Sequence, residues 1–157
     1  MQKWLAAPHV AIWWNEPFDL ASLEDKYGPG IDGREPMHVY LIELDRFPIG
    51  WIQWYRWRDF PMHAIQLGAD HSSAGIDLAI GEIEMTGHGL GPAVIRQFGI
   101  NYIFTHGDLA AIVADPSASN LHSVSAFKKA GFNLVRKVQL KDEEFERHIV
   151  RWNRVEE

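Results

Sequence analysis

The stretch GHGLG at residues 87–91 places three glycines in five positions, and an apolar-periodic run follows it at once. Leu90, Val94 and Phe98 recur four residues apart, which predicts a helix with one apolar face to about residue 103. Pro92 falls in the first turn of that helix, where a missing N–H is tolerated. A glycine-rich turn that opens a helix exposes backbone N–H groups at the positive end of the helix dipole. The stretch is therefore either a pyrophosphate-binding turn or a tight turn required for close helix packing.

Two nucleotide-binding motifs do not match this turn. GHGLG lacks the Gly-Lys-Ser/Thr ending of a P-loop. It is also more compact than a dinucleotide fingerprint, and it follows a region that reads as antiparallel strands instead of opening a βαβ unit.

The order of predicted elements indicates a mixed α/β fold. Residues 37–44 and 50–57 are rich in β-branched and aromatic residues, and the turn residues DRFPIG between them predict a hairpin. The remaining predictions are a functional loop or short helix at 58–73, a strand at 74–84 with Gly81 as a candidate bulge, a buried strand at 109–115, a helix at 120–130, a solvated hairpin turn at 141–147 and two closing strands. Ser119 or Asn120 is expected to cap the helix at 120–130, and Gly131 to end it with Phe132 folding back.

Length and composition predict one soluble domain over residues 1–157. A chain of 157 residues buries about two thirds of its unfolded surface, and 46% hydrophobic with 23% charged residues is ordinary for a globular protein. Most of the seven tryptophans are expected in the core. The absence of cysteine excludes disulfides and thiolate chemistry, and the eight histidines lack ligand spacing, so no metal site is predicted.

Charge and hydropathy limit the expected partners. A net charge of −6 disfavours nucleic-acid binding. The N-terminal residues lack the apolar run of a signal peptide, and no stretch is long and apolar enough to cross a bilayer. We therefore expect a cytoplasmic protein that binds neither nucleic acid nor membrane.

Two segments in a fixed order resemble a known superfamily. TGHGLGPAVI, followed about thirty residues later by DPSASNLHSVSAFKKAGF, is similar to the GNAT N-acetyltransferases. The segments HVAIWW (9–14), PIGWIQWY (48–55), GID (75–77) and DPSASN (115–120) look like the branch that contains the aminoglycoside 6′-N-acetyltransferases and some siderophore-pathway acyltransferases. The resemblance extends from about Trp4 to Trp152, and it implies a mostly antiparallel central sheet flanked by helices.

The resemblance also implies acetyl-CoA as the acetyl donor, without a metal. Its pyrophosphate is expected on the glycine turn, its pantetheine between the two central strands, and its carbonyl near the backbone N–H groups around Ala79 to Glu82. The cofactor-binding residues so implied are Ile80, Gly81, Glu82, Gly87, His88, Gly89, Leu90, Gly91, Asn120 and Ser123. Trp13, Trp14 and Tyr55 are expected to line the acceptor pocket, although packing explains each of them about as well.

Two aspartates are the expected catalytic and acceptor-binding residues. Asp77 and Asp115 match acidic positions that face the substrate amines in the aminoglycoside-modifying relatives. A carboxylate there would orient an amine and take its proton. Asp115 could instead merely open the turn before Pro116 and cap the next helix. Asp59 and Asp70 of the long loop could add carboxylates for a polyamine.

Three features depart from the superfamily pattern. Phe127 stands where many members have a tyrosine that protonates the leaving thiolate, which leaves Ser123, Ser125 or unassisted departure. Thr86 and Pro92 replace possible cofactor contacts. The sheet is also expected to lack the usual first strand of the superfamily. An open sheet edge is then expected, covered by a second copy in a homodimer.

The sequence thus predicts an acetyl-CoA-dependent N-acetyltransferase that acts on a small cationic amine, with an aminoglycoside 6′-amine as first choice. An acyltransferase for a siderophore precursor or another metabolite amine or hydroxylamine stays open. So does a non-catalytic acyl-CoA-binding module, which the departures at Phe127 and Pro92 would suit.

Overall fold

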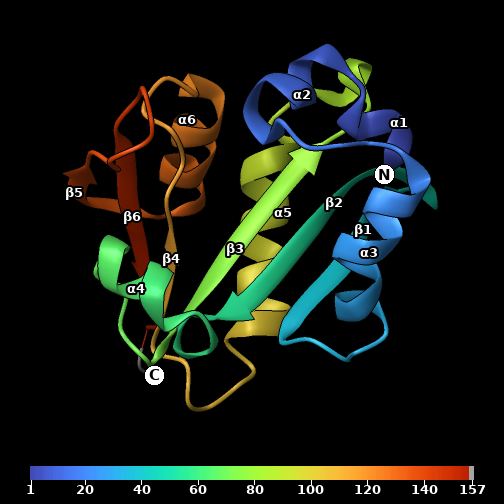
Figure 1. The fold of residues 1–157 in the computed structure, drawn as a ribbon. Helices are drawn as coiled ribbons and strands as arrows, with labels where there is room; N and C mark the ends of the chain where they lie inside the picture. The colour runs from blue at the N-terminus through green and yellow to red at the C-terminus, as the bar shows by residue number, and fades with distance from the viewer. Residues whose placement is uncertain (156–157) are drawn as a thin grey trace. The chain divides into compact units, whose positions relative to one another are not determined.

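The fold is described from a computed structural model of the chain, covering residues 1–155 (Figure 1). The chain forms two compact parts, which are described separately. The first part comprises Met1–Tyr55 and Asp77–Gly91, and the second comprises Arg56–Ile76 and the chain from Pro92 onward. The prediction of a single domain over residues 1–157 stays a prediction.

The first part joins three N-terminal helices to a β-hairpin and to the end of a central strand. Its elements are α1 (Gln2–Leu5), α2 (Pro8–Trp14), α3 (Leu20–Ile31), β1 (Met37–Leu44), β2 (Phe47–Arg56), the end of β3 (Ser73–Ile80) and the 3₁₀ turn η2 (Ile83–Met85). No strand precedes β1 within residues 1–155, which agrees with the expected lack of a first strand. None of the helices in these residues is long and apolar enough to span a bilayer.

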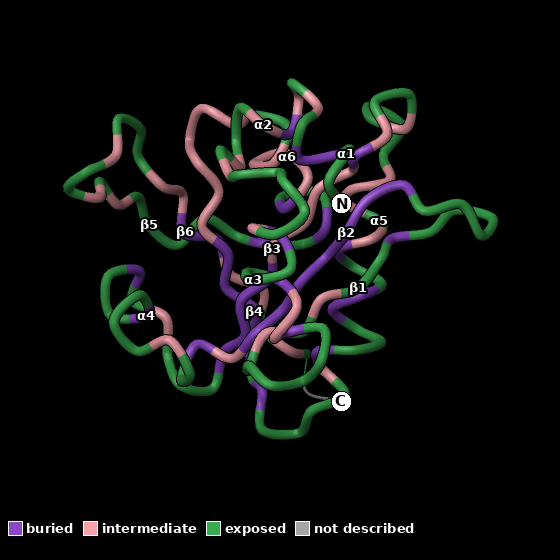
Figure 2. The backbone as a smooth tube through the Cα atoms, turned by 45° about the vertical axis from the view of Figure 1, so that its right-hand side comes forward, coloured by how far each residue is buried: buried purple, intermediate pink, exposed green. Residues whose placement is uncertain are grey.

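The predicted hairpin is confirmed, with a tighter turn than expected. Strands β1 and β2 pair in antiparallel register from Met37 opposite Tyr55 to Leu44 opposite Phe47. Asp45 and Arg46 form the turn with positive φ values of 50° and 69°, as two-residue hairpins require. Strand β2 therefore starts at Phe47, three residues before the prediction. Most of β2 is buried, and Figure 2 shows it in purple beside the exposed hairpin turn.

The core of the first part is built on tryptophan. Trp4 and Trp51 stack in near-parallel planes with ring centroids 6.1 Å apart, and Trp14 tilts against Trp51 at 4.9 Å. Leu5, Val10, Leu23 and Tyr27 complete this cluster from the three helices. Sequence reasoning assigned no helix to α3, because Gly28, Pro29 and Gly30 disguise its last turn. Its start is conventional: the Asp19 carboxylate accepts the Ser22 amide at 3.0 Å.

The end of β3 is fixed by a close approach of Trp4. A Cβ added to Gly81 would lie 2.0 Å from Cγ of the Trp4 indole, so only glycine fits there. The strand ends at Ile80, before the predicted limit of residue 84. The amides of Gly81 and Glu82 both donate to the Ile49 carbonyl, at 2.7 and 3.1 Å. Two consecutive amides on one carbonyl are the hydrogen-bond pattern of a β-bulge, here placed just beyond the strand.

The second part contains the remaining elements. These are η1 (Trp57–Asp59), α4 (Pro61–Leu67), the start of β3, α5 (Leu90–Phe98) from Pro92 onward, the π-helical turn η3 (Gly99–Ile103), β4 (Ala111–Ala114), α6 (Leu121–Ala130), β5 (Asn133–Val138) and β6 (Arg147–Asn153). The short helix predicted within 58–73 is confirmed as α4. The helix predicted to reach residue 103 does so, but its last five residues are π-helical.

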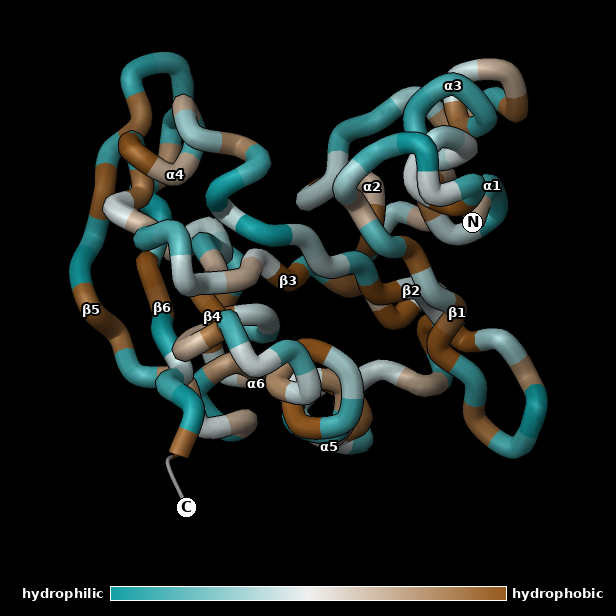
Figure 3. Tube along the Cα trace, turned by 90° about the horizontal axis from the view of Figure 1, so that it is seen from below, coloured by the Kyte–Doolittle hydropathy of each residue, from teal (hydrophilic) through white to brown (hydrophobic). Residues whose placement is uncertain are grey.

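Strand β4 occupies the centre of the second part. All four of its residues are buried, and Figure 3 shows them in hydrophobic brown. It pairs in parallel with the start of β3, where Ser73 lies opposite Ala111, and in antiparallel with β6 along its whole length. Across the chain the strands are hydrogen-bonded in the order β1-β2-β3-β4-β6-β5, so the sheet is mixed and mostly antiparallel, as predicted.

Helix α6 begins and ends as the sequence predicts. Asn120 caps it by accepting the Ser123 amide at 3.1 Å. Gly131 ends it in the left-handed conformation with φ of 111°. Phe132 then folds back against Phe127, with ring centroids 5.0 Å apart in an edge-to-face arrangement.

We predict that Gly81→Ala lowers the free energy of unfolding by about 1–3 kcal/mol, because the added methyl forces Trp4 out of its place in the tryptophan core. Urea denaturation measures this change. Gly107→Ala is the control, since a Cβ there meets nothing within 4 Å and the residue has no positive φ; it should be neutral or slightly stabilising. Equal effects of the two substitutions would contradict the close approach of Trp4.

Candidate functional site

The glycine turn at residues 87–91 leads into α5, and three of its five residues have no side chain. Gly87 and Gly89 both have φ of +77°, a conformation that side chains with a Cβ rarely adopt. A Cβ at either position would meet nothing within 4 Å, so the space above the turn is open. Residues 87–89 are exposed, while Leu90 and Gly91 are partly buried at the start of the helix. The described residues 1–155 therefore place no side-chain or backbone atom where a Cβ at these two glycines would lie.

Ile80, Gly81 and Glu82 are held by the N-terminal helices. His9 Nε2 lies 3.1 Å from the Ile80 carbonyl oxygen. The Glu82 carboxylate accepts Nζ of Lys3 and Nε1 of Trp4, each at 2.7 Å, and the hydrogen bond from Lys3 leads those that hold its pKa below the usual value. The Gly81 and Glu82 amides are both bonded to Ile49. These residues thus shape the end of β3, and their polar groups are engaged within the fold.

Asp77 on β3 faces a buried glutamine of β2. Gln53 Nε2 donates to Asp77 Oδ2 at 3.1 Å, and Gln53 is only 6% exposed. Gln53 Oε1 is buried and has no hydrogen-bond partner within residues 1–155. The first part therefore holds a carboxylate bonded to the amide N–H of a buried glutamine, and the carbonyl oxygen of the same amide has no donor within residues 1–155.

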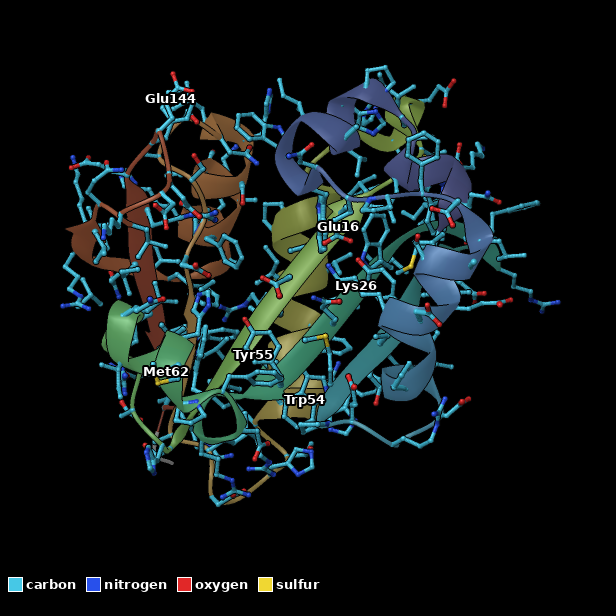
Figure 4. All side chains as sticks on the ribbon, viewed as in Figure 1. Glu16, Lys26, Trp54, Tyr55, Met62 and Glu144 are labelled. Atoms are coloured by element: carbon cyan, nitrogen blue, oxygen red, sulfur yellow. The ribbon has the colours of Figure 1, made fainter. Side chains whose placement is uncertain are left out.

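A second acidic group belongs to the same part. Glu16 accepts the Tyr27 hydroxyl at 2.7 Å and pairs with Lys26, and Figure 4 labels Glu16 and Lys26. Burial is the main cause that raises the pKa of Tyr27 far above its usual value, followed by its hydrogen bond to Glu16 and the negative charges of Glu16 and Asp77. Because both carboxylates oppose ionisation of Tyr27, Asp77 and Glu16 contribute to one region of negative potential.

The aromatic residues predicted for the acceptor pocket have unequal exposure. Trp13 is 41% exposed on α2, whereas Tyr55 is buried on β2. Trp14 is partly buried against Trp51, so packing accounts for its place. Of the three, Trp13 alone presents a large free surface.

Asp115, in the second part, directly follows β4. Its carboxylate is largely buried, and His63 Nε2 of α4 lies 3.7 Å from its Oδ2. Its backbone carbonyl accepts Arg147 Nη1 at 3.2 Å, and the same guanidinium binds both oxygens of Glu143. The hydrogen bonds from Arg147 hold the pKa of Glu143 below its usual value. Asp115 does not cap α6, because Asn120 occupies that position.

Other predicted polar residues of this part are engaged locally. Asn120 Oδ1 and the Ser123 amide are bonded to each other, and Phe127 is buried against Phe132. The Asp70 carboxylate accepts Arg151 Nη1 at 2.6 Å and also Ser72, and these contacts lower its pKa although burial acts the other way. The negative charge of Asp70 is therefore already balanced by Arg151 within the fold.

Sequence reasoning missed two polar neighbours of the aspartates, Gln53 and His63. A polar residue in the middle of the apolar run GWIQWY was the available signal for Gln53. His63 carried none, because only the folded chain brings α4 beside the end of β4. No group of three or more histidines and carboxylates in residues 1–155 is arranged to hold a metal ion.

Comparison with known proteins agrees with this fold and these motifs. Residues 1–140 match the family described as acetyltransferase (GNAT) domain. Aminoglycoside N(6′)-acetyltransferase type 1 of Klebsiella pneumoniae is 28% identical over 145 residues, which cover 84% of this chain and 67% of that protein. The protein of the same name from Serratia marcescens is equally similar.

Solved structures are similar over almost the whole chain. A crystal structure of aminoglycoside acetyltransferase AAC(6′)-Ib with coenzyme A has a TM-score of 0.80 at 26% identity, covering 98% of this chain and 87% of that one. Another, with coenzyme A and kanamycin, has a TM-score of 0.79 at 27% identity with the same coverage. With the family match over most of its length, the chain belongs to the GNAT acetyltransferase family and is an acyl-CoA-dependent N-acetyltransferase.

Proposed function

We propose that this protein transfers the acetyl group of acetyl-CoA to the 6′-amine of an aminoglycoside. The observation that carries the choice of acceptor is the pair formed by Asp77 and Gln53 in the first part. The likeness to aminoglycoside acetyltransferases, one of them solved with kanamycin, supports the same choice.

The acceptor oxygens of the first part suit an ammonium group. A buried carbonyl left without a donor costs about 1–3 kcal/mol, so Gln53 Oε1 favours a ligand that donates a hydrogen bond. Asp77 supplies a negative charge beside it, and Glu16 adds to the negative potential of this region. An ammonium has three donors and no acceptor, which matches a carboxylate and a carbonyl oxygen. A polyamine such as an aminoglycoside offers several such groups.

The turn at Gly87–Gly91 would hold the pyrophosphate of acetyl-CoA. Its two positive-φ glycines leave open space over backbone N–H groups at the start of α5. When bound, acetyl-CoA supplies the thioester carbonyl that a neutral amine attacks. The other cofactor contacts suggested by the family resemblance, among them Ile80, Asn120 and Ser123, belong to this proposal.

Asp115 would take the proton of the attacking amine. Its carboxylate is largely shielded from water and carries no hydrogen bond from a side chain in residues 1–155, so it can accept one. With Phe127 buried and lacking a hydroxyl, the CoA thiolate would leave unassisted, since a thiol pKa of about 8.5 makes it a competent leaving group.

We predict that acetyl-CoA raises the melting temperature of the wild type and that Gly89→Asp abolishes this shift, because the new carboxylate repels the phosphates. Differential scanning fluorimetry measures both. Gly107→Asp is the matched control: it adds the same charge at an open glycine elsewhere and should keep the full shift. A folded Gly89→Asp protein with an unchanged shift would remove the turn from the binding site.

For the two aspartates we predict different kinetic effects with kanamycin as acceptor. Asp115→Asn should lower kcat by about a hundredfold or more, the scale of one lost general base. Asp77→Asn should mainly raise KM, because it would hold an ammonium without taking part in proton transfer. A thiol-release assay measures both, with Asp25→Asn on the exposed face of α3 as control.

The assay also tests the acceptor. Turnover of a hydroxylamine or diamine with none of any aminoglycoside would move the protein to the siderophore-type alternative. If the wild type acetylates the drug and neither variant differs from it, the roles assigned to both aspartates are wrong.

We also propose that the edge of β1 joins a second copy of the chain. This strand is first in the sheet order, and Leu41 and Phe47 of its hairpin are 58% and 73% exposed. Sedimentation velocity should therefore give a dimer, and Leu41→Lys should give a monomer while Ile100→Lys, at an exposed position of η3, should not. A wild-type monomer at high micromolar concentration would exclude this assembly.

A further inference from the structure

His63 is the basic side chain beside the Asp115 carboxylate. Its Nε2 lies 3.7 Å from Asp115 Oδ2, and it is the only basic side chain within 4.0 Å of that carboxylate in residues 1–155. The Asp115 side chain is 14% exposed, whereas that of His63 is 51% exposed. The carboxylate of this pair is thus largely shielded from water, whereas the imidazole is in contact with it.

The position of the His63 ring is set by contacts to the strand that carries Asp115. The ring stacks on Trp57 with centroids 5.5 Å apart and planes inclined by 28°. Trp57 is 1% exposed, and its Nε1 donates to the carbonyl of Val113 on β4 at 3.2 Å. Asp115 follows Val113 by two residues. One buried indole therefore fixes the imidazole relative to β4, although α4 itself is short and mostly exposed.

We propose that His63 receives the proton that Asp115 removes from the acceptor amine and passes it to solvent. This inference rests on the proposed function, because it assumes that Asp115 is the base. His63 is then a positioning and relay residue that acts through Asp115 and does not itself touch the acceptor.

The proton balance of the reaction leaves one proton to be released to the medium. An acceptor that arrives as an ammonium loses two N–H protons while the N–C bond forms and the C–S bond breaks. One proton ends on the thiol of CoA, and the other is released to the medium. Asp115 must lose its proton before the next turnover, and His63 is a neighbouring base that is more exposed to water than Asp115. An imidazole takes a proton on Nε2 and releases the one on Nδ1, so it can carry it outward.

The charged groups around His63 are compatible with this role. Asp115 directly follows β4, and Glu143 lies in the turn before β6. Arg147 on β6 donates to the backbone carbonyl of Asp115 and to both carboxylate oxygens of Glu143. When protonated, His63 adds to the effect by which Arg147 lowers the pKa of Glu143, so the two side chains sense each other. The carboxylates of Asp115 and Glu143 stabilise the protonated His63 transiently, and Arg147 offsets part of their negative charge. Only neutral His63 can accept a proton, so the rate should rise with pH through the ionisation of His63.

The first test is the pH dependence of acetyl transfer. We expect kcat of the wild type to rise with pH as His63 loses its proton, because only the neutral imidazole can accept one. His63→Gln should lower kcat by about tenfold, less than Asp115→Asn because water still removes the proton slowly, and this limb of the profile should disappear. His71→Gln, at an exposed histidine before β3, is the matched control and should keep the wild-type profile.

The second test separates a relay from a packing role. In His63→Ala, added imidazole should restore kcat several-fold, and it should have no effect on Asp115→Asn or the wild type. NMR titration of His63 should show a lower pKa in Asp115→Asn than in the wild type, because the neighbouring negative charge is gone; this readout needs no activity. Melting temperatures confirm that the variants are folded.

The outcomes distinguish this inference from the function on which it rests. If the wild type acetylates amines while His63→Gln keeps the full rate and pH profile, or imidazole fails to rescue His63→Ala, the relay is wrong and the proposed function stands. If His63 titrates identically in Asp115→Asn, the pair does not exist and the relay is again wrong. If no amine is acetylated by the wild type, the proposed function itself fails.

Discussion

The backbone of β4 imposes the strictest requirement in the second part of the chain. Its four residues are fully buried, so every N–H and C=O needs a partner inside the protein. The start of β3 and the whole of β6 supply them from the two sides. The Val113 carbonyl also accepts the indole N–H of Trp57, which brings η1 and α4 against this strand. The positions of Asp115 and His63 depend on this bonding. Asp115 directly follows β4, and His63 stacks on Trp57, whose indole N–H binds a β4 carbonyl.

In the first part, packing at Gly81 has a comparable effect. Trp4 lies where a side chain at this position would be, and its indole N–H binds the next residue, Glu82. The end of β3 is thereby joined to α1, which in turn contributes to the tryptophan core with Trp51. Trp4 thus connects α1, the end of β3 and the tryptophan core. The N-terminal helices therefore support this part of the sheet. The glycine turn at residues 87–91 then continues from this fixed point through η2.

Elements whose bounds depend on neighbouring residues in the chain could be predicted from the sequence. The helix at α6 could be predicted to its caps, because Asn120 and Gly131 are strong start and stop signals. Strand β1 was predicted over its whole length, whereas the end of β3 was not, because Trp4 that limits it is 77 positions away from Gly81. The same difference between local and long-range contacts explains which residues of the candidate site could be predicted. Asp77 and Asp115 were recognised from motifs, but Gln53 and His63 approach them only through tertiary folding, and no periodicity encodes those contacts.

These neighbours make two similar carboxylates chemically different. Asp77 lies beside a glutamine that both donates to it and presents a buried oxygen, with Glu16 adding negative potential. Such a setting suits the cation-binding role that we propose for Asp77. Asp115 instead has an imidazole next to it that is half open to water and can change its own charge near neutral pH. A carboxylate that must give up a proton in every cycle is better served by the second setting. The division of roles that we propose for the aspartates thus rests on what surrounds each of them, and it requires no difference in the aspartates themselves.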